Sequence, residues 1–224
     1  KNKIMKFTIE EGKKIWFTSD IHYWHKNITY GDSVWDDKEV SCRKFNTTRE
    51  MSLHMINQIN KYVKEDDILF HCGDWSFSGI ENILNLRKQL NVKTIHHING
   101  NHDHHISDNK LIKNYFIGVN SDEIVHDKDI DDLKDHYAPL YTKQLFTTVN
   151  DYLEIKIGKQ LIVLSHYPFQ SWRDISKGSI HLHGHTHGNI NSIKNRLDVG
   201  LDSAFKMFGE YKPFGFDNII EILK

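Results

Sequence analysis

The sequence predicts an α/β fold in which two facing sheets carry helices on their outer sides. In the first half, short apolar runs alternate with helical patterns, which is typical of parallel strands joined by right-handed crossovers. The second half is richer in strand patterns and contains an alternating hairpin at residues 152–164. No linker, repeat or low-complexity segment divides the chain, so we expect one domain over residues 1–224.

The first half supplies a regular series of elements. Ile15-Trp16-Phe17-Thr18 is a β-prone run, and Thr47 with Glu50 has the spacing of a helix capping box. A second such spacing, Ser78 to Glu81, precedes another helical pattern. The predicted order is a strand at 15–18, a helix at 47–63, a strand at 68–70, a helix from 78 to about 90, and a strand at 92–98.

The second half is predicted to be mostly strands. We expect a short helix at 111–117, hairpin strands at 152–157 and 160–164, and strands at 179–183, 196–199 and 217–223. Two long polar segments, 23–46 and 104–138, are expected to be loops that shape a pocket, because long loops in compact domains tend to be functional.

Composition narrows the class of protein. Hydrophobic residues make up 38% and charged residues 26%, which favours a globular, soluble chain over a disordered one. The net charge of -1 gives no reason to expect a long nucleic acid as partner. No apolar run has membrane-spanning length and no leader pattern is present, so we expect no membrane partner. The two cysteines, Cys42 and Cys72, favour free thiols in a reducing, cytoplasmic compartment.

Polar side chains that can bind metal follow most of the predicted strands. Their oxygen and imidazole atoms, without thiolate, suit ions such as Mn, Fe or Zn. They are too many for one ion and about right for two, and two ions about 3.5–4 Å apart share a bridging hydroxide that attacks phosphorus. These residues are Asp20, His22, Asp74, Asn101, His102, Asp103, His166, His185 and His187.

The clusters match, in order, the five motifs of a known family. They are Asp20-Ile21-His22, Gly73-Asp74, Gly100-Asn101-His102-Asp103, His166 and Gly184-His185-Thr186-His187. With these motifs the chain resembles the calcineurin-like metallophosphoesterases, and the match runs from residue 20 to residue 187. The resemblance implies a four-layer α/β/β/α sandwich with two mixed sheets, the metallophosphatase fold. The stretches 19–28, 43–45 and 198–202 look like a small bacterial and phage subgroup of that superfamily.

The same resemblance implies a role for each residue. Asp20, His22 and His187 would hold one metal ion, and Asn101, His166 and His185 the other, with Asp74 bridging both. His102 would stabilise the transition state or protonate the leaving oxygen, and Asp103 would orient it. The cofactors would be two divalent ions, manganese first, with Fe, Zn, Ni or Co as alternatives. The implied activity is a binuclear phosphoesterase that hydrolyses a phosphate monoester or diester by attack of a metal-bridging hydroxide.

For several residues the sequence allows both a functional and a structural role. His25 lies beside the first motif and would contact substrate or support a ligand. Arg43 would pair with a phosphate, since a guanidinium does so bidentately, or would form a surface salt bridge. The aromatic residues Trp24, Trp35, Trp75 and Phe77 would form a base-stacking wall or ordinary core, and His96, His97, His181 and His183 are expected to be strand histidines satisfied by neighbours.

The function also keeps alternatives. The same centre could serve a narrower phosphodiesterase that acts on cyclic nucleotides or nucleic-acid ends, and a small phosphoester or nucleotide is the expected partner. A non-catalytic binding scaffold should have lost one or more of the motif residues, and all are present. A metal-storage protein would not need the pair His102 and Asp103. The identity of the substrate and the oligomeric state stay open.

Overall fold

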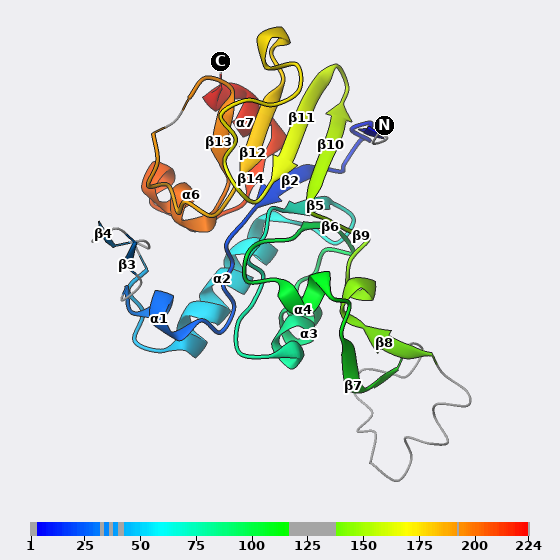
Figure 1. Cartoon of the computed structure of the whole chain (residues 1–224), viewed down its shortest axis with the longest axis vertical. Coiled ribbons are helices and arrows are strands. Elements are labelled where there is room, and N and C mark those ends of the chain that lie inside the picture. The colour runs from blue at the N-terminus through cyan, green and yellow to red at the C-terminus, as the bar shows by residue number, and fades with distance from the viewer. Residues whose placement is uncertain are drawn as a thin grey trace.

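The computed structural model describes residues 4–31, 34–35, 38–39, 43–116, 138–191 and 193–223. Among these residues it contains two five-stranded mixed sheets with flanking helices, so the predicted fold class is confirmed. Figure 1 shows one sheet, β10 to β13, standing beside the carboxyl-terminal helices, and the other, β2 to β9, above the helices of the first half. No described helix is long and apolar enough to cross a membrane.

The sheet built mainly from the first half, here called the first sheet, has the order β14-β2-β5-β6-β9. Strands β2, β5, β6 and β9 run parallel, and β14 joins antiparallel at one edge. The predicted alternation of strands and crossover helices is therefore confirmed. The strand bounds are β2 Ile15–Thr18, β5 Ile68–His71, β6 Thr94–Ile98, β9 Thr148–Asn150 and β14 Phe214–Gly215.

The second sheet has the order β1-β10-β11-β12-β13. Its centre is the predicted antiparallel hairpin, in which Tyr152 pairs with Ser165 and Ile157 with Gln160. Strand β12 then runs parallel to both β11 and β13. The bounds are β1 Met5–Phe7, β10 Tyr152–Ile157, β11 Gln160–Ser165, β12 Ile180–His183 and β13 Arg196–Asp198.

Helices α2 and α3 cover the outer face of the first sheet. Thr47 caps α2 by accepting the amide of Glu50, as the capping box predicts. Met51, Met55 and Ile59 of α2 pack with strand residues in one apolar cluster. The remaining elements are α1 Lys26–Thr29, β3 Val34–Trp35, β4 Lys38–Glu39, α2 Thr48–Tyr62, α3 Ile80–Gln89, α4 His104–Ser107, β7 Leu111–Phe116, β8 Pro139–Tyr141, the 3₁₀ helices η2 Thr142–Leu145 and η3 Ile175–Lys177, α6 Leu201–Phe208 and α7 Phe216–Ile222.

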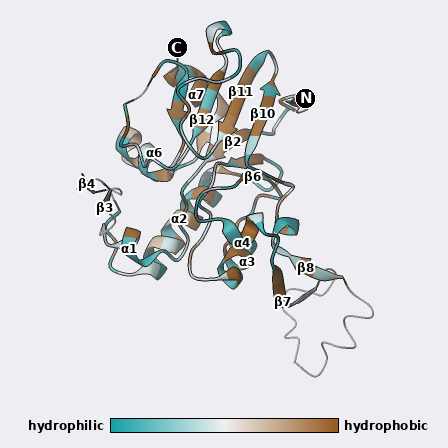
Figure 2. Ribbon diagram, in the orientation of Figure 1, coloured by the Kyte–Doolittle hydropathy of each residue, from teal (hydrophilic) through white to brown (hydrophobic). Residues whose placement is uncertain are grey.

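A second apolar cluster joins the two sheets. Phe17 and Phe70 from the first sheet pack with Ile155, Leu164 and Leu182 from the second. Figure 2 shows β10 and β11 as largely hydrophobic, whereas α2 is hydrophobic along only part of its surface. Burial of these side chains fixes how the two sheets face each other, and that fixes where their strand ends meet.

The other face of β12 explains two of the strand histidines. Because Ile180 and Leu182 face the cluster between the sheets, His181 and His183 lie on the opposite face. There the ring of His181 stacks on Phe169 at 4.9 Å between ring centroids. Its Nδ1 contacts Val163 O at 3.1 Å and its Nε2 accepts the Phe169 amide at 3.0 Å, so this histidine is satisfied by neighbours, as predicted.

Three sequence predictions are wrong. The predicted strand at 217–223 is the helix α7, whose residues Phe216, Ile219, Ile220 and Leu223 pack on the cluster between the sheets at helical spacing. The predicted helix at 111–117 is the strand β7, which pairs with the distant β8. Helix α3 begins after Gly79 rather than at a Ser78 cap, because both residues have positive φ, +113° for Gly79 and +64° for Ser78.

Candidate metal centre

The parallel register of the first sheet brings three motifs to one edge. Thr18 pairs with His71, and His71 pairs with His97, so the chain leaves all three strands at the same level. The first two motifs are then joined directly, because the amide of Asp20 donates to Gly73 O at 2.9 Å and that of His22 to Asp74 O at 3.1 Å. The third motif follows β6 at the same edge.

The second sheet delivers the last two motifs to this edge. The amide of Gly184 donates to His166 O at 3.0 Å, which ties the end of β12 to the end of β11. The amide of His185 donates to both carboxylate oxygens of Asp20, at 3.0 and 3.2 Å. Residues about 165 positions apart therefore meet between the two sheets.

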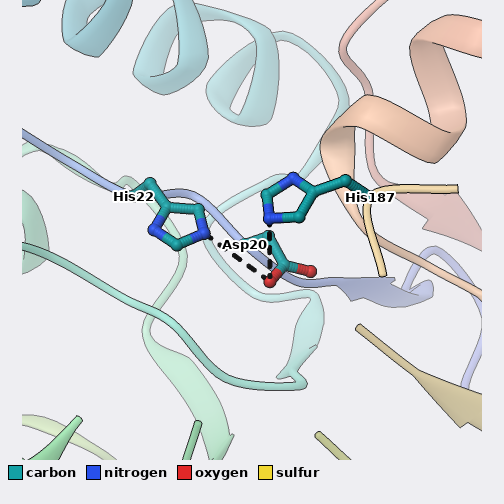
Figure 3. A group of neighbouring side chains, drawn as sticks. All are labelled: Asp20, His22 and His187. Carbon is teal, nitrogen blue, oxygen red and sulfur yellow. Dashed lines mark ion pairs between the residues drawn. The ribbon is translucent and has the colours of Figure 1, made fainter. Parts of the chain in front are cut away.

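Asp20, His22 and His187, here called the first half-site, form a buried group. The Nε2 atoms of His22 and His187 lie 3.7 and 3.9 Å from Oδ1 of Asp20. Figure 3 shows both rings turned toward this carboxylate. All three side chains are at most 5% exposed. One ligand atom from each lies within 4.8 Å of the others, a spacing that fits one metal ion.

Asp74 connects this group to the next. Its Oδ2 lies 3.7 Å from His22 Nε2 and 3.5 Å from His166 Nε2. Asp20, Asp74 and His166 make a second group within 4.8 Å that shares Asp20 with the first. Two overlapping buried triads thus offer places for metal ions.

Asn101, His166 and His185, here called the second half-site, gather around one amide oxygen. Asn101 Oδ1 lies 2.9 Å from His166 Nε2 and 3.0 Å from His185 Nδ1. Asn101 is exposed and His185 half-buried, whereas His166 is buried. The exposed ring of Tyr167 lies 4.7 Å from that of His185. This half-site is therefore the more open one.

Five of these residues have a left-handed backbone. Their φ angles are +55° for Asp20, +52° for His22, +60° for Asp74, +69° for His185 and +49° for His187. Such a conformation is uncommon outside glycine and costs about 1–3 kcal/mol, so it persists only where the surrounding structure enforces it. Its concentration at this edge is typical of a functional site.

Two motif glycines are required by close packing. A Cβ at Gly73 would collide with the ring of His166, and a Cβ at Gly100 would collide with the carboxylate of Asp74. Gly73 also has a φ of +100°, which other residues rarely adopt. The glycines of these motifs therefore bring backbone directly against the proposed ligands.

The outer hydrogen bonds of two rings leave Nε2 free to bind a metal. Nδ1 of His166 must donate to Cys72 O, at 2.8 Å, because a carbonyl oxygen only accepts. Nδ1 of His187 lies 2.7 Å from the Asp202 carboxylate, which likewise only accepts when ionised. Both nitrogens of His22 are buried without a hydrogen-bond partner among the described residues. Orphaned imidazole nitrogens beside carboxylates fit a metal ion well.

The carboxylates of the centre need a cation. Burial raises the pKa of Asp20 to about 7, with repulsion from Asp198 and Asp202 adding to it. Burial and the nearby Asp20 and Asp103 raise the pKa of Asp74 to about 9. A divalent ion would restore the ionised form of both. The donor set therefore fits two divalent ions on chemistry as well as on geometry.

His102 lies at the mouth of the centre. Its side chain is 42% exposed, and Nε2 is 4.0 Å from Oδ2 of Asp74. Its amide donates to Oδ1 of the same residue at 3.0 Å. Burial lowers its pKa. The ring therefore lies between the candidate ligands and solvent.

Asp103 does not orient the His102 ring in the way the resemblance implied. Its carboxylate accepts the amides of Asp74, Trp75 and Gly100 at 2.7, 2.9 and 2.7 Å, and pairs with His97 Nε2 at 3.3 Å. Burial alone would raise the pKa of Asp103, but His97 holds it well below its usual range. Its geometric role is to clamp the turn that carries Asp74.

Arg43 is also a correction. It was expected at a phosphate or in a surface salt bridge, but its side chain is fully buried and pairs with Asp202. It lies behind the first motif, since its guanidinium donates to the backbone oxygens of Asp20 and Ile21. A substrate phosphate has no access to it.

His25 lies beside the centre. Its ring stacks on Phe77 with centroids 3.6 Å apart and planes 6° apart, and lies 5.2 Å from the ring of His22. Phe77 in turn lies 4.5 Å from His102. Of the other aromatic candidates, Trp75 is buried core and Trp24 is 38% exposed, while the side chain of Trp35 lies outside the described residues, as does Cys42.

Sequence reasoning missed two supporting residues, Asp202 and His97. Asp202 lies in the stretch 198–202 that resembles the phage and bacterial subgroup, but its position in the sequence predicts no role. His97 was expected to be satisfied by neighbours, and its contact with Asp103 gives it a definite partner. Only the folded chain brings these residues to the site, which is why spacing gave no signal.

Comparison with known proteins supports the fold. No family model matches the sequence, and no curated protein matches it either. Among solved structures the chain is similar to the crystal structure of AQ665 from Aquifex aeolicus, a protein of unknown function. The two share 20% sequence identity with a TM-score of 0.54, over 94% of this chain and 100% of that one. At this identity the likeness shows the fold alone.

Proposed function

We propose that this chain is a binuclear metal-dependent phosphoesterase of the calcineurin-like kind. One observation carries the proposal: the buried carboxylates of Asp20 and Asp74 lie 3.5–3.9 Å from imidazole nitrogens of His22, His166 and His187. Groups that are buried, acidic and close together repel each other unless cations separate them. Arranged at the ends of strands from two sheets, they surround a space suited to two ions.

The first half-site and Asp74 would hold one divalent ion, and the second half-site with Asp74 the other. Ions held there would supply a water nucleophile at neutral pH and neutralise the oxygens of a phosphoryl group. The neutral Asn101 would limit the negative charge around the second ion, so that its Lewis acidity is retained. The exposed Asn101 and half-buried His185 would leave room for the substrate on that side.

His102 would hold a proton for the departing oxygen. Its ring is within reach of Asp74, and its exposed side faces the solvent from which a substrate arrives. Phe77, against the His102 ring, would restrict its orientation. A positioned proton donor of this kind contributes about 10²–10⁴-fold to the rate.

The test is hydrolysis by manganese-reconstituted protein. The panel would contain an aryl phosphate monoester, an aryl phosphodiester, and 2′,3′- and 3′,5′-cyclic nucleotides, and it separates a general phosphoesterase from a cyclic-nucleotide enzyme. Asp74→Asn should lose metal and activity together, because Oδ2 of Asp74 lies 3.7 Å from Nε2 of His22 in one half-site and 3.5 Å from Nε2 of His166 in the other. Asp67→Asn, a buried carboxylate that bonds Lys14 N and Trp16 Nε1 instead, is the matched control.

Binding of two manganese ions without hydrolysis of any panel member would favour the non-catalytic scaffold. A wild-type protein that binds none of the divalent ions Mn, Fe, Zn, Ni and Co would refute the proposal altogether. Activity that survives chelation with EDTA and persists in Asp74→Asn would do the same, since both remove the centre.

A further inference from the structure

Behind the first half-site lies a buried ion pair that no step of the proposed chemistry uses. The guanidinium of Arg43 and the carboxylate of Asp202 are both fully buried, with Nη2 to Oδ2 at 2.9 Å and Nε to Oδ1 at 3.2 Å. The two residues are 159 positions apart in the sequence. Ion pairs of this kind are weak sources of stability, because removing two charges from water costs about as much as their attraction returns. Its contacts indicate what else the pair does.

Each member of the pair holds a different part of the metal centre. Asp202 Oδ2 also accepts Nδ1 of His187 at 2.7 Å, which fixes the ring and leaves Nε2 facing Asp20. Arg43 Nη1 donates to Ile21 O at 2.9 Å, and Nη2 to Asp20 O at 2.5 Å. These two carbonyls belong to the strained first motif. The pair therefore ties His187 to the backbone that carries Asp20 and His22.

We propose that the buried Arg43–Asp202 pair is a positioning device for the metal centre, which holds His187 and the first motif in register with each other. This inference rests on the proposed metal centre. A carboxylate behind a metal-binding imidazole sets the tautomer and orientation of the ring and raises its basicity as a ligand. The guanidinium, in turn, neutralises this carboxylate and also donates to two backbone oxygens. A lysine, with a single point charge, could not make all of these contacts.

Helix α6 anchors the device. Asp202 is the second residue of α6, and the N-cap residue of this helix, Gly200, bridges to Ser19. The amide of Leu201 also donates to Ser19 O at 3.3 Å. The start of α6 is therefore fastened to the residue that precedes Asp20, so that Asp202 moves with the first motif rather than with the surface.

The test compares manganese affinity between variants by calorimetry on the metal-free chain. Asp202→Asn keeps the shape of the side chain but removes its charge, and we expect affinity to fall by about 10–100-fold. Arg43→Lys keeps the charge, but one ammonium group cannot reach both Asp202 oxygens and the two backbone oxygens. We expect its manganese affinity to fall as well, by less than in Asp202→Asn. Asp67→Asn, an equally conservative change at a buried carboxylate that lies just before β5 and accepts Trp16 Nε1 of β2, should bind manganese like the wild type.

A spectroscopic readout separates positioning from general damage. Electron paramagnetic resonance of bound Mn²⁺ should show a spin-coupled pair in the wild type, and isolated ions in Asp202→Asn at the same metal concentration. If Asp202→Asn fails to fold because the buried charge of Arg43 loses the Asp202 carboxylate, the double variant Asp202→Asn/Arg43→Gln removes that charge and should show the same loss of affinity.

Affinity and spectrum both unchanged in Asp202→Asn or in the double variant would overturn the positioning role, while leaving the proposed function intact. An equal loss of affinity in Asp67→Asn would overturn it too, since the effect would then belong to any buried carboxylate. A wild-type chain that binds none of the divalent ions Mn, Fe, Zn, Ni and Co would overturn both proposals together.

Discussion

The two half-sites differ in what lies behind their ligands. Behind the first, the carboxylate of Asp202 and the guanidinium of Arg43 form a charged and fully buried layer. Behind the second, His166 donates to a neutral carbonyl, Cys72 O, and Asn101 is exposed. Burial alone would lower the pKa of His187, but Asp202 raises it, whereas burial lowers the pKa of His166 to about 4.

Under the proposed function, this difference predicts that the two half-sites have different roles. A buried, charge-supported group is suited to holding an ion permanently, because every ligand is fixed by a second contact. An open group with a neutral amide is suited to meeting a substrate, because it keeps charge low and leaves access.

The largest effect should come from His22→Ala compared with Asn101→Ala. His22 is buried between Asp20 and Asp74, so its loss should remove bound metal and reduce activity by about 10³-fold or more, which corresponds to several kcal/mol. Asn101 is exposed and water can replace its oxygen at the proposed ion, so we expect a smaller loss than in His22→Ala. Calorimetric manganese binding and initial rates measure both, and equal losses would erase the proposed contrast.

His102→Ala should separate metal binding from turnover. We expect both ions to stay bound while kcat falls by about 10²–10⁴-fold, because only the proton donor is removed. His104→Ala, the exposed histidine two residues later, is the matched control and should leave kcat unchanged. If His102→Ala turns over like the wild type, the residue has no part in the reaction.

Metal-free protein should lose stability between pH 7 and pH 9. Both carboxyls have folded-state pKa values above the ordinary 3.8, but Asp20, at about 7, releases its extra proton near the start of this range, whereas Asp74, at about 9, still holds one that it must release as pH rises. The slope should reach at most about 1.4 kcal/mol per pH unit for each proton. Histidines with lowered pKa values act oppositely, but only below about pH 6.5, where unfolded histidine titrates.

Thermal melts across this range, with and without Mn²⁺, provide the measurement. Manganese should flatten the slope, because a cation favours the ionised carboxylates, and metal-free Asp74→Asn should also melt with a shallower dependence. A metal-free wild type whose Tm is level from pH 7 to pH 9 would contradict the buried-carboxylate account.

The smallest effect should come from His25→Ala. His25 stacks on Phe77, which touches His102, so its loss should loosen the proton donor and lower kcat by less than about tenfold without changing metal affinity. His54→Ala, a partly buried histidine that packs on Phe45 and Tyr211, is the control. A loss of bound metal in His25→Ala would instead assign this residue to the ligands.

Much of the fold could be predicted from local patterns. Short-range periodicity and turn residues predict the strand at 15–18, the capped helix after Thr47 and the hairpin at 152–164. Helix α7 was missed because its isoleucines favour strands, although their spacing is helical. Strand β7 was missed because its partner, β8, is distant in the sequence and no local pattern reveals such a pairing.

The candidate site divides in the same way. Its ligands could be predicted because each follows an apolar run, and parallel strands place such residues at one edge. The supports behind them could not, because Arg43 meets Asp202, and His97 meets Asp103, only after the sheets have packed. Interpreting Arg43 as a phosphate contact failed for this reason: its burial is a property of the folded chain.

The left-handed turns at Asp20, His22, Asp74, His185 and His187 have a kinetic consequence. The amides of Asp20 and His22 bond to Gly73 O and Asp74 O, so the backbone itself fixes the first turns, and we expect folding rather than metal uptake to place the candidate ligands. We therefore expect uptake of Mn²⁺ by the folded chain to be a single fast phase, first order in ion concentration, with no slow ordering step behind it.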